Sequence, residues 1–98
     1  MSGAGLYETP GGEGESRENR LKRLSMRSMR RGIKEMDIIL KNWADASLED
    51  LDEEMLTLYD RLLSENDQDL YQWVTGQVAA PDAFAALIEV IATHAGAR

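Results

Sequence analysis

Apolar residues recur at steps of three and four along most of the chain, a spacing that places them on one face of an α-helix. The clearest run has leucine and methionine at this spacing without interruption: Leu48, Leu51, Met55, Leu58 and Leu62. No segment alternates apolar and polar residues with a period of two. The pattern therefore predicts helices and no strands.

Capping and helix-breaking residues divide the pattern into five segments. Gly32 interrupts the first run of helical spacing, and the segment 47–50 resembles a capping box that opens the third helix. Asn66 and Asp67 can supply the N-cap of a fourth helix that Gly76 ends, and Pro81 suits the first turn of a fifth. The sequence predicts an all-α fold, a compact five-helix bundle with short loops.

The aromatic residues indicate where the core lies. Trp43, Trp73 and Phe84 fall on apolar helix faces, so we expect them to be buried. We expect Tyr59 and Tyr71 at the edges of the core. A chain of 98 residues can bury one modest core, which argues against a large enzyme with a two-domain cleft.

The first sixteen residues differ in composition from the rest. They are rich in glycine, serine and glutamate, with Pro10, Gly11 and Gly12 at their centre. Such a segment buries too little apolar surface to order itself. We predict a disordered tail over residues 1–16 and a single helical domain over residues 17–98.

The net charge of −7 is unevenly distributed. Residues 1–16 carry −3, residues 17–41 carry +6 and residues 42–98 carry −10. This asymmetry suggests that the basic first helix either folds onto the acidic part of its own domain or meets an acidic partner surface.

The arginines of the first helix also permit a second interpretation, a small helical nucleic-acid-binding or regulatory protein. Arginines recur at steps of three or four along this helix, at Arg20, Arg23, Arg27 and Arg30. A stripe of this kind can bind along the phosphate backbone of a nucleic acid. The acidic chain and the scarcity of aromatic residues among the arginines argue against this alternative. We expect no nucleic acid partner.

The sequence offers few groups for chemistry of its own. It has no cysteine, which excludes disulfides, zinc fingers and thiol catalysis, and its one histidine is His94 near the end of the last helix. No serine or cysteine is placed by sequence to make His94 a catalytic base. We expect no enzymatic activity, no metal and no cofactor bound by the chain itself.

The sequence also carries information about membrane insertion and the cellular compartment. No apolar run approaches the roughly 18 to 20 residues that a membrane-spanning helix needs. Residues Glu8, Glu13 and Glu15 argue against an Arg-rich transit peptide, and no signal-peptide pattern is visible. We expect a cytoplasmic protein without membrane insertion.

The segment 30–37 combines a glycine with charges of both signs. Gly32 lacks a Cβ, so it can sit at a tight helix–helix junction or let another protein's backbone approach closely. Arg31 and Glu35 share a face if the helix continues and flank the turn if it does not. Taken alone, the segment fits a C-cap glycine with a solvated ion pair worth roughly 0 to 1 kcal/mol.

Several motifs taken together resemble the succinate dehydrogenase assembly factor family, the small flavinylation factors called SdhE in bacteria, which have a mitochondrial counterpart. The resemblance runs from about residue 27 to residue 91. It is specific because the motifs agree in order and spacing. They are Arg31-Gly32-Ile33-Lys34-Glu35, Tyr59-Asp60-Arg61-Leu62-Leu63, Asp67-Gln68-Asp69-Leu70-Tyr71-Gln72-Trp73 and the helix led by Pro81.

The resemblance implies a chaperone-like role. The family binds the flavoprotein subunit of succinate dehydrogenase, and in some bacteria that of fumarate reductase, and promotes covalent attachment of FAD to a histidine of that subunit. By position, the resemblance places the functional surface at Arg31, Gly32 and Glu35, with Arg30 and Asp37 beside them. FAD would belong to the partner, and we expect the factor to be a monomer when free.

Overall fold

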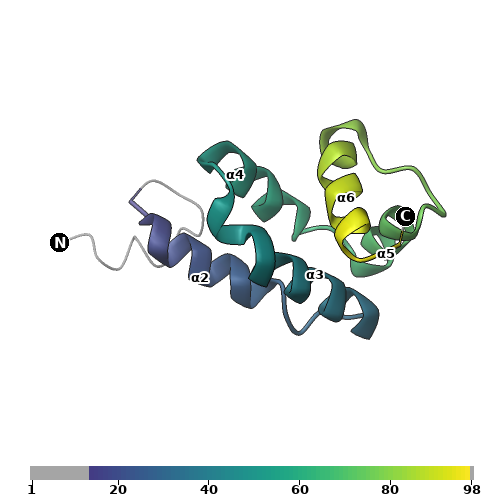
Figure 1. Ribbon diagram of the computed structural model, residues 1–98, viewed down its shortest axis with the longest axis horizontal. Helices are drawn as coiled ribbons and strands as arrows, with labels where there is room; N and C mark the ends of the chain where they lie inside the picture. The colour runs from purple at the N-terminus through teal and green to yellow at the C-terminus, as the bar shows by residue number, and fades with distance from the viewer. Residues whose placement is uncertain (1–13, 98) are drawn as a thin grey trace.

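The computed structural model describes residues 14–97, which form five α-helices and one short 3-10 helix (Figure 1). These elements are α2 (Arg17–Arg27), α3 (Lys34–Ser47), η1 (Leu48–Asp50), α4 (Glu53–Leu62), α5 (Asp67–Thr75) and α6 (Asp82–His94). The described residues contain no strand, so the predicted five-helix, all-α bundle is confirmed. None of the described helices combines the length and apolar character needed to cross a bilayer.

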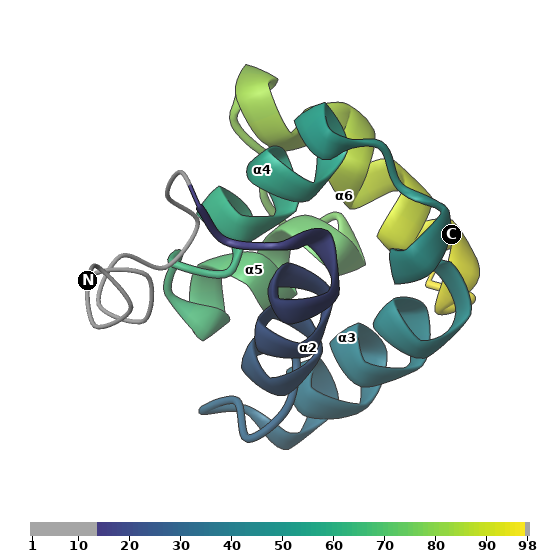
Figure 2. The ribbon, with the colours of Figure 1, turned by 90° about the vertical axis from the view of Figure 1, so that its left-hand side faces the viewer.

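Helix α3 lies at the centre of the packing. It lies beside α2 (Figures 1 and 2) and also contacts α5 and α6. Helices α5 and α6 pack against each other at the end of the molecule that carries the C-terminus (Figure 1). The loop between α2 and α3, residues 28–33, is hydrogen-bonded to the first residue of α5.

The start of α4 differs from the prediction. No capping box forms over residues 47–50, because Leu48–Asp50 is a 3-10 helix and the Ser47 side chain makes no capping hydrogen bond. Instead Asp52 caps α4, accepting from the backbone N–H of Met55 at 2.8 Å. Leu48 is buried in the core at the end of α3, so the chain turns only after it, through extended backbone at Leu51.

The other predicted boundaries are confirmed. Asn66 caps α5, with its side-chain oxygen accepting from the backbone N–H of Gln68 at 2.8 Å. Gly76 follows α5 with a φ of 82°, the left-handed conformation that glycine adopts without steric cost. Pro81 directly precedes α6.

The aromatic core is confirmed with one correction. Trp43, Trp73 and Phe84 are buried as predicted. Tyr59, predicted at the edge, is fully buried and packs on Trp43 with 4.9 Å between ring centroids. Its hydroxyl lies 2.5 Å from that of the buried Ser28, so the polar end of the ring is satisfied inside the core. Burial raises the pKa of Tyr59 to about 12.

Of the predicted tail, residues 1–13 lie outside the described residues. The described end of that segment contacts the first helix. The Glu15 carboxylate accepts from Arg23 at 2.8 Å (Nε) and 3.1 Å (Nη2), and Ser16 caps α2 by accepting from the backbone N–H of Asn19 at 3.1 Å. Residues 15 and 16 therefore belong to the start of the helical domain.

Candidate functional site

Arg31 lies in the α2–α3 loop, and its guanidinium points into the domain. Its Nη1 donates to the carbonyl of Arg27 at 2.8 Å, at the end of α2, and its Nη2 donates to the carbonyl of Leu63 at 3.0 Å, at the end of α4. Its Nε donates to Asp67 Oδ1 at 2.9 Å, at the start of α5. Only 11% of the side chain is exposed. Arg31 therefore joins the ends of three helices.

Asp67 also binds Gly32. While Oδ1 accepts from Arg31, Oδ2 accepts from the backbone N–H of Gly32. A Cβ on Gly32 would lie 3.2 Å from this Oδ2, closer than a carbon atom normally comes. The glycine thus makes room for a carboxylate of its own chain. We call these three residues, Arg31, Gly32 and Asp67, the Asp67 clamp.

The next contact fixes the backbone of the loop. Arg30 has a φ of 57°, a left-handed conformation that costs a non-glycine residue roughly 1 to 2 kcal/mol. Its backbone N–H donates to Asp37 Oδ1 at 2.9 Å, across the start of α3. Asp37 thus holds the loop in this strained form. Strained residues of this kind occur at functional sites more often than elsewhere.

Three charged side chains of this region face solvent instead. Arg30, Lys34 and Glu35 are exposed, and none of their side chains makes a hydrogen bond or ion pair within residues 14–97. We call them the loop charges. They lie within residues 30–35 at the α2–α3 junction, carry both signs of charge and are accessible to a partner.

The structure therefore divides the five site residues named from the sequence. Arg31 and Gly32 face Asp67, Asp37 supports the backbone, and only Arg30 and Glu35 present free side chains. Arg31 and Glu35 form no ion pair, because the helix does not run through Gly32. Lys34 and Asp67 were not among the predicted site residues. Both stood in motifs of the resemblance, and Asp67 was interpreted only as part of a helix cap.

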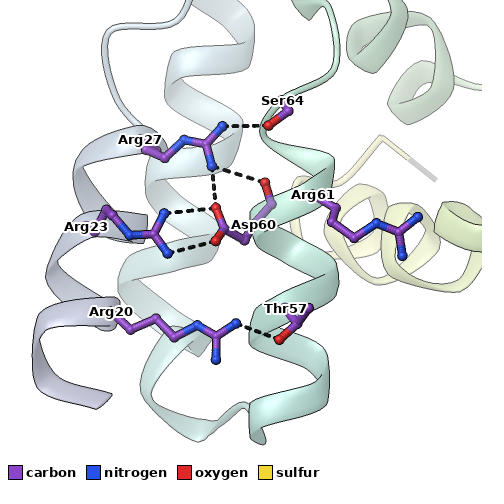
Figure 3. Close-up of a pocket in the computed structure, with 7 residues that line it drawn as sticks. All are labelled: Arg20, Arg23, Arg27, Thr57, Asp60, Arg61 and Ser64. Carbon is purple, nitrogen blue, oxygen red and sulfur yellow. Dashed lines mark hydrogen bonds and ion pairs between the residues drawn. The ribbon is translucent and has the colours of Figure 1, made fainter. Parts of the chain in front are cut away.

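The arginine face of α2 packs against α4 (Figure 3). Arg23 binds Asp60 through two nitrogens at 2.9 and 2.7 Å, and Arg27 binds both Asp60 and the Ser64 hydroxyl. Arg20 donates to Thr57 at 2.5 Å. Hydrogen bonds from Arg23, together with the charges of Arg23 and Arg27, lower the pKa of Asp60 and keep it ionised.

These contacts do not favour the nucleic-acid interpretation. The α2–α4 groove has a volume of about 560 Å³, yet the arginines that line it from α2 are bound to carboxylates and hydroxyls of the chain. Arg61 points away from Asp60 (Figure 3) and lies over the Phe84 ring at 5.7 Å. The basic first helix folds onto the acidic part of its own domain, one of the two outcomes that its charge suggested.

The described residues hold no group of three or more His, Asp and Glu side chains placed to bind a metal ion. The fold and the loop thus define a small helical domain that carries unpartnered charges of both signs at the α2–α3 junction.

Sequence similarity to known proteins identifies the family of this chain. The sequence profile of the family described as "Flavinator of succinate dehydrogenase" matches residues 22–95. Relatives named "Succinate dehydrogenase assembly factor 2, mitochondrial" include those of Meyerozyma guilliermondii, 44% identical over 62 residues, and Drosophila grimshawi, 34% identical over 92 residues. These matches cover 63% and 91% of this chain, and 46% and 63% of the respective relatives.

The chain belongs to the family of succinate dehydrogenase flavinators, as its motifs suggested. It spans less than two thirds of the length of the relatives described above. The relatives are named mitochondrial, so the expectation of a cytoplasmic protein is wrong. The transit-peptide argument that supported it used only a few acidic residues of the first sixteen, and composition of that kind is a weak signal of location.

Proposed function

We propose that the chain binds the flavoprotein subunit of succinate dehydrogenase and promotes covalent attachment of FAD to a histidine of that subunit. Membership of the flavinator family supports this proposal. The observation that carries it in the structure is the group of exposed loop charges, which lie in the motif of residues 31–35 or directly before it and have no partner among residues 14–97.

The proposed mechanism is conformational. The chain holds the partner subunit in a form that favours the subunit's own bond formation with FAD. Arg30 and Lys34 meet acidic groups of the partner, and Glu35 meets a basic group. Contacts of this kind strengthen as the interface excludes water. FAD stays with the partner, and the chain acts as a monomer.

The resemblance extends the proposal to a second partner, the flavoprotein subunit of fumarate reductase. Both subunits can be compared in one binding assay with the purified chain.

A matched pair of variants tests the docking surface. Glu35 and Glu54 are both exposed glutamates, each the second residue of its helix, and neither side chain has a hydrogen bond or ion pair within the described chain. Glu35→Ala should weaken binding to the flavoprotein subunit by about tenfold, whereas Glu54→Ala should bind as wild type. Equal affinities of the two variants would show that the partner does not dock at the loop.

A further inference from the structure

We propose that Asp67 is a positioning residue for partner docking, which acts through Arg31 and Gly32 to hold the loop charges in place. The inference rests on the proposed function. In this proposal Asp67 itself does not contact the partner.

The place of Asp67 in the fold suits this role. It is the first residue of α5, and Asn66 caps that helix, so the Asp67 backbone is held by regular structure. Only 15% of its side chain is exposed. From this fixed point the carboxylate binds two consecutive residues of the α2–α3 loop: Arg31 through Nε at 2.9 Å and Nη2 at 2.8 Å, and Gly32 through its N–H.

The same geometry favours a glycine at position 32. Gly32 is not among the residues with positive φ, so its backbone conformation does not require one. The constraint is the Asp67 carboxylate, 3.2 Å from the position of a Cβ. A side chain at position 32 would push against Asp67 before any partner arrives. The preference for glycine thus arises inside the chain, and a substitution must displace either the Asp67 carboxylate or the loop.

The clamp is coupled to the loop charges through the short loop. Arg30 directly precedes the two clamped residues and is held in left-handed backbone that it would leave if released. Lys34 and Glu35 follow Gly32 within a few residues, in the first turn of α3. Without the clamp, only the hydrogen bond from the Arg30 N–H to Asp37 would still hold this part of the loop. We expect Arg30 then to move relative to Glu35, which lowers affinity although neither side chain has changed.

The test compares two aspartates in the first turn of α5. Asp69 is exposed and makes no hydrogen bond or ion pair within residues 14–97, so Asp69→Ala controls for the loss of charge. With the full chain and purified flavoprotein subunit, Asp67→Ala should raise the Kd about tenfold and Asp69→Ala less than twofold. Asp67→Asn keeps an acceptor for the Gly32 N–H but turns an amide NH2 towards the Arg31 guanidinium, so it should recover only part of the affinity.

Combined variants separate positioning from general destabilisation. If Asp67 acts through the loop, Glu35→Ala should cost less affinity in the Asp67→Ala background than alone, and Gly32→Ala should add almost nothing there. A role in fold stability alone would give additive costs among folded variants. Additive costs, or an Asp67→Ala variant that binds like Asp69→Ala, would overturn the proposal.

A measurement on the free protein distinguishes this proposal from the proposed function. Hydrogen exchange of the Gly32 amide should accelerate in Asp67→Ala and stay unchanged in Asp69→Ala, and an unchanged rate in Asp67→Ala would refute the clamp itself. A wild-type chain that does not bind the flavoprotein subunit would overturn the proposed function and the positioning role together, even with the Gly32 amide protected.

Discussion

Replacement of Arg31 by alanine should lower the free energy of unfolding by about 3 kcal/mol. The side chain is 11% exposed and binds Asp67 together with the carbonyls of Arg27 and Leu63. A hydrogen bond to a charged group contributes roughly 1.5 to 3 kcal/mol, and a buried group that loses its partner costs about 1 to 3 kcal/mol. Some water reaches Asp67 in the variant, so we take a total near the lower end of the combined range.

The size of this loss in the free energy of unfolding distinguishes two interpretations of Arg31, a solvated surface pair and a residue that joins helix ends. A solvated surface pair contributes roughly 0 to 1 kcal/mol, much less than a residue that joins three helix ends. The neighbouring Arg30 has an exposed side chain without partners within the described chain, so Arg30→Ala should stay within about 0.5 kcal/mol of wild type.

Urea denaturation followed by circular dichroism measures both variants. Arg31→Ala should lower the urea concentration at the unfolding midpoint without changing the m value, the slope of the free energy against urea concentration. It should lower the Tm by roughly 12 to 24 °C for a domain of this size. A loss below about 1 kcal/mol, equal to that of Arg30→Ala, would refute the structural role of Arg31.

Two further predictions concern pH. Because hydrogen bonds from Arg23 lower the pKa of Asp60, its contribution to stability is present above the unfolded carboxyl pKa of about 4 and is lost as the pH falls towards the folded value. Asp60→Asn should be less stable at pH 7 and should lose less stability between pH 5 and pH 3, measured by urea midpoints across that range; a pH dependence equal to wild type would contradict the assignment. Burial raises the pKa of Tyr59 to about 12, so wild type should lose stability as the pH rises from the unfolded value of about 10 through 12. Tyr59→Phe should remove part of this alkaline loss and cost about 1 kcal/mol at pH 7 through the lost contact with Ser28, and an unchanged alkaline transition by circular dichroism would count against it.

The fold could be predicted from the sequence because its signals are local. Apolar residues at helical spacing, an asparagine cap and a left-handed glycine each act within a few residues, and they placed most boundaries correctly. The start of α4 was missed because the burial of Leu48 against the rest of the core overrode a plausible capping sequence. Tyr59 was placed too near the surface because its buried partner, Ser28, lies 31 residues away in the chain.

The segment proposed as the site could be singled out from the sequence, but its internal contacts could not be predicted. The segment 30–37 stood out because it combines a glycine with charges of both signs. Which residues face inward depends on Asp67, which lies 36 residues from Arg31 and has a sequence context that a helix cap already explains. In the same way, fourteen acidic residues follow the basic helix, and only the packing of α2 on α4 selects Asp60 for Arg23 and Arg27.

The proposed function requires that the chain speeds flavin attachment to a partner subunit by docking through its loop charges. Purified flavoprotein subunit without flavin can be mixed with FAD, and covalent flavin followed by fluorescence of the denatured subunit in gels. We predict fast attachment with the wild-type chain, slow attachment with Glu35→Ala, and a rate with Glu54→Ala that matches wild type. Equal rates with and without the wild-type chain would contradict the account.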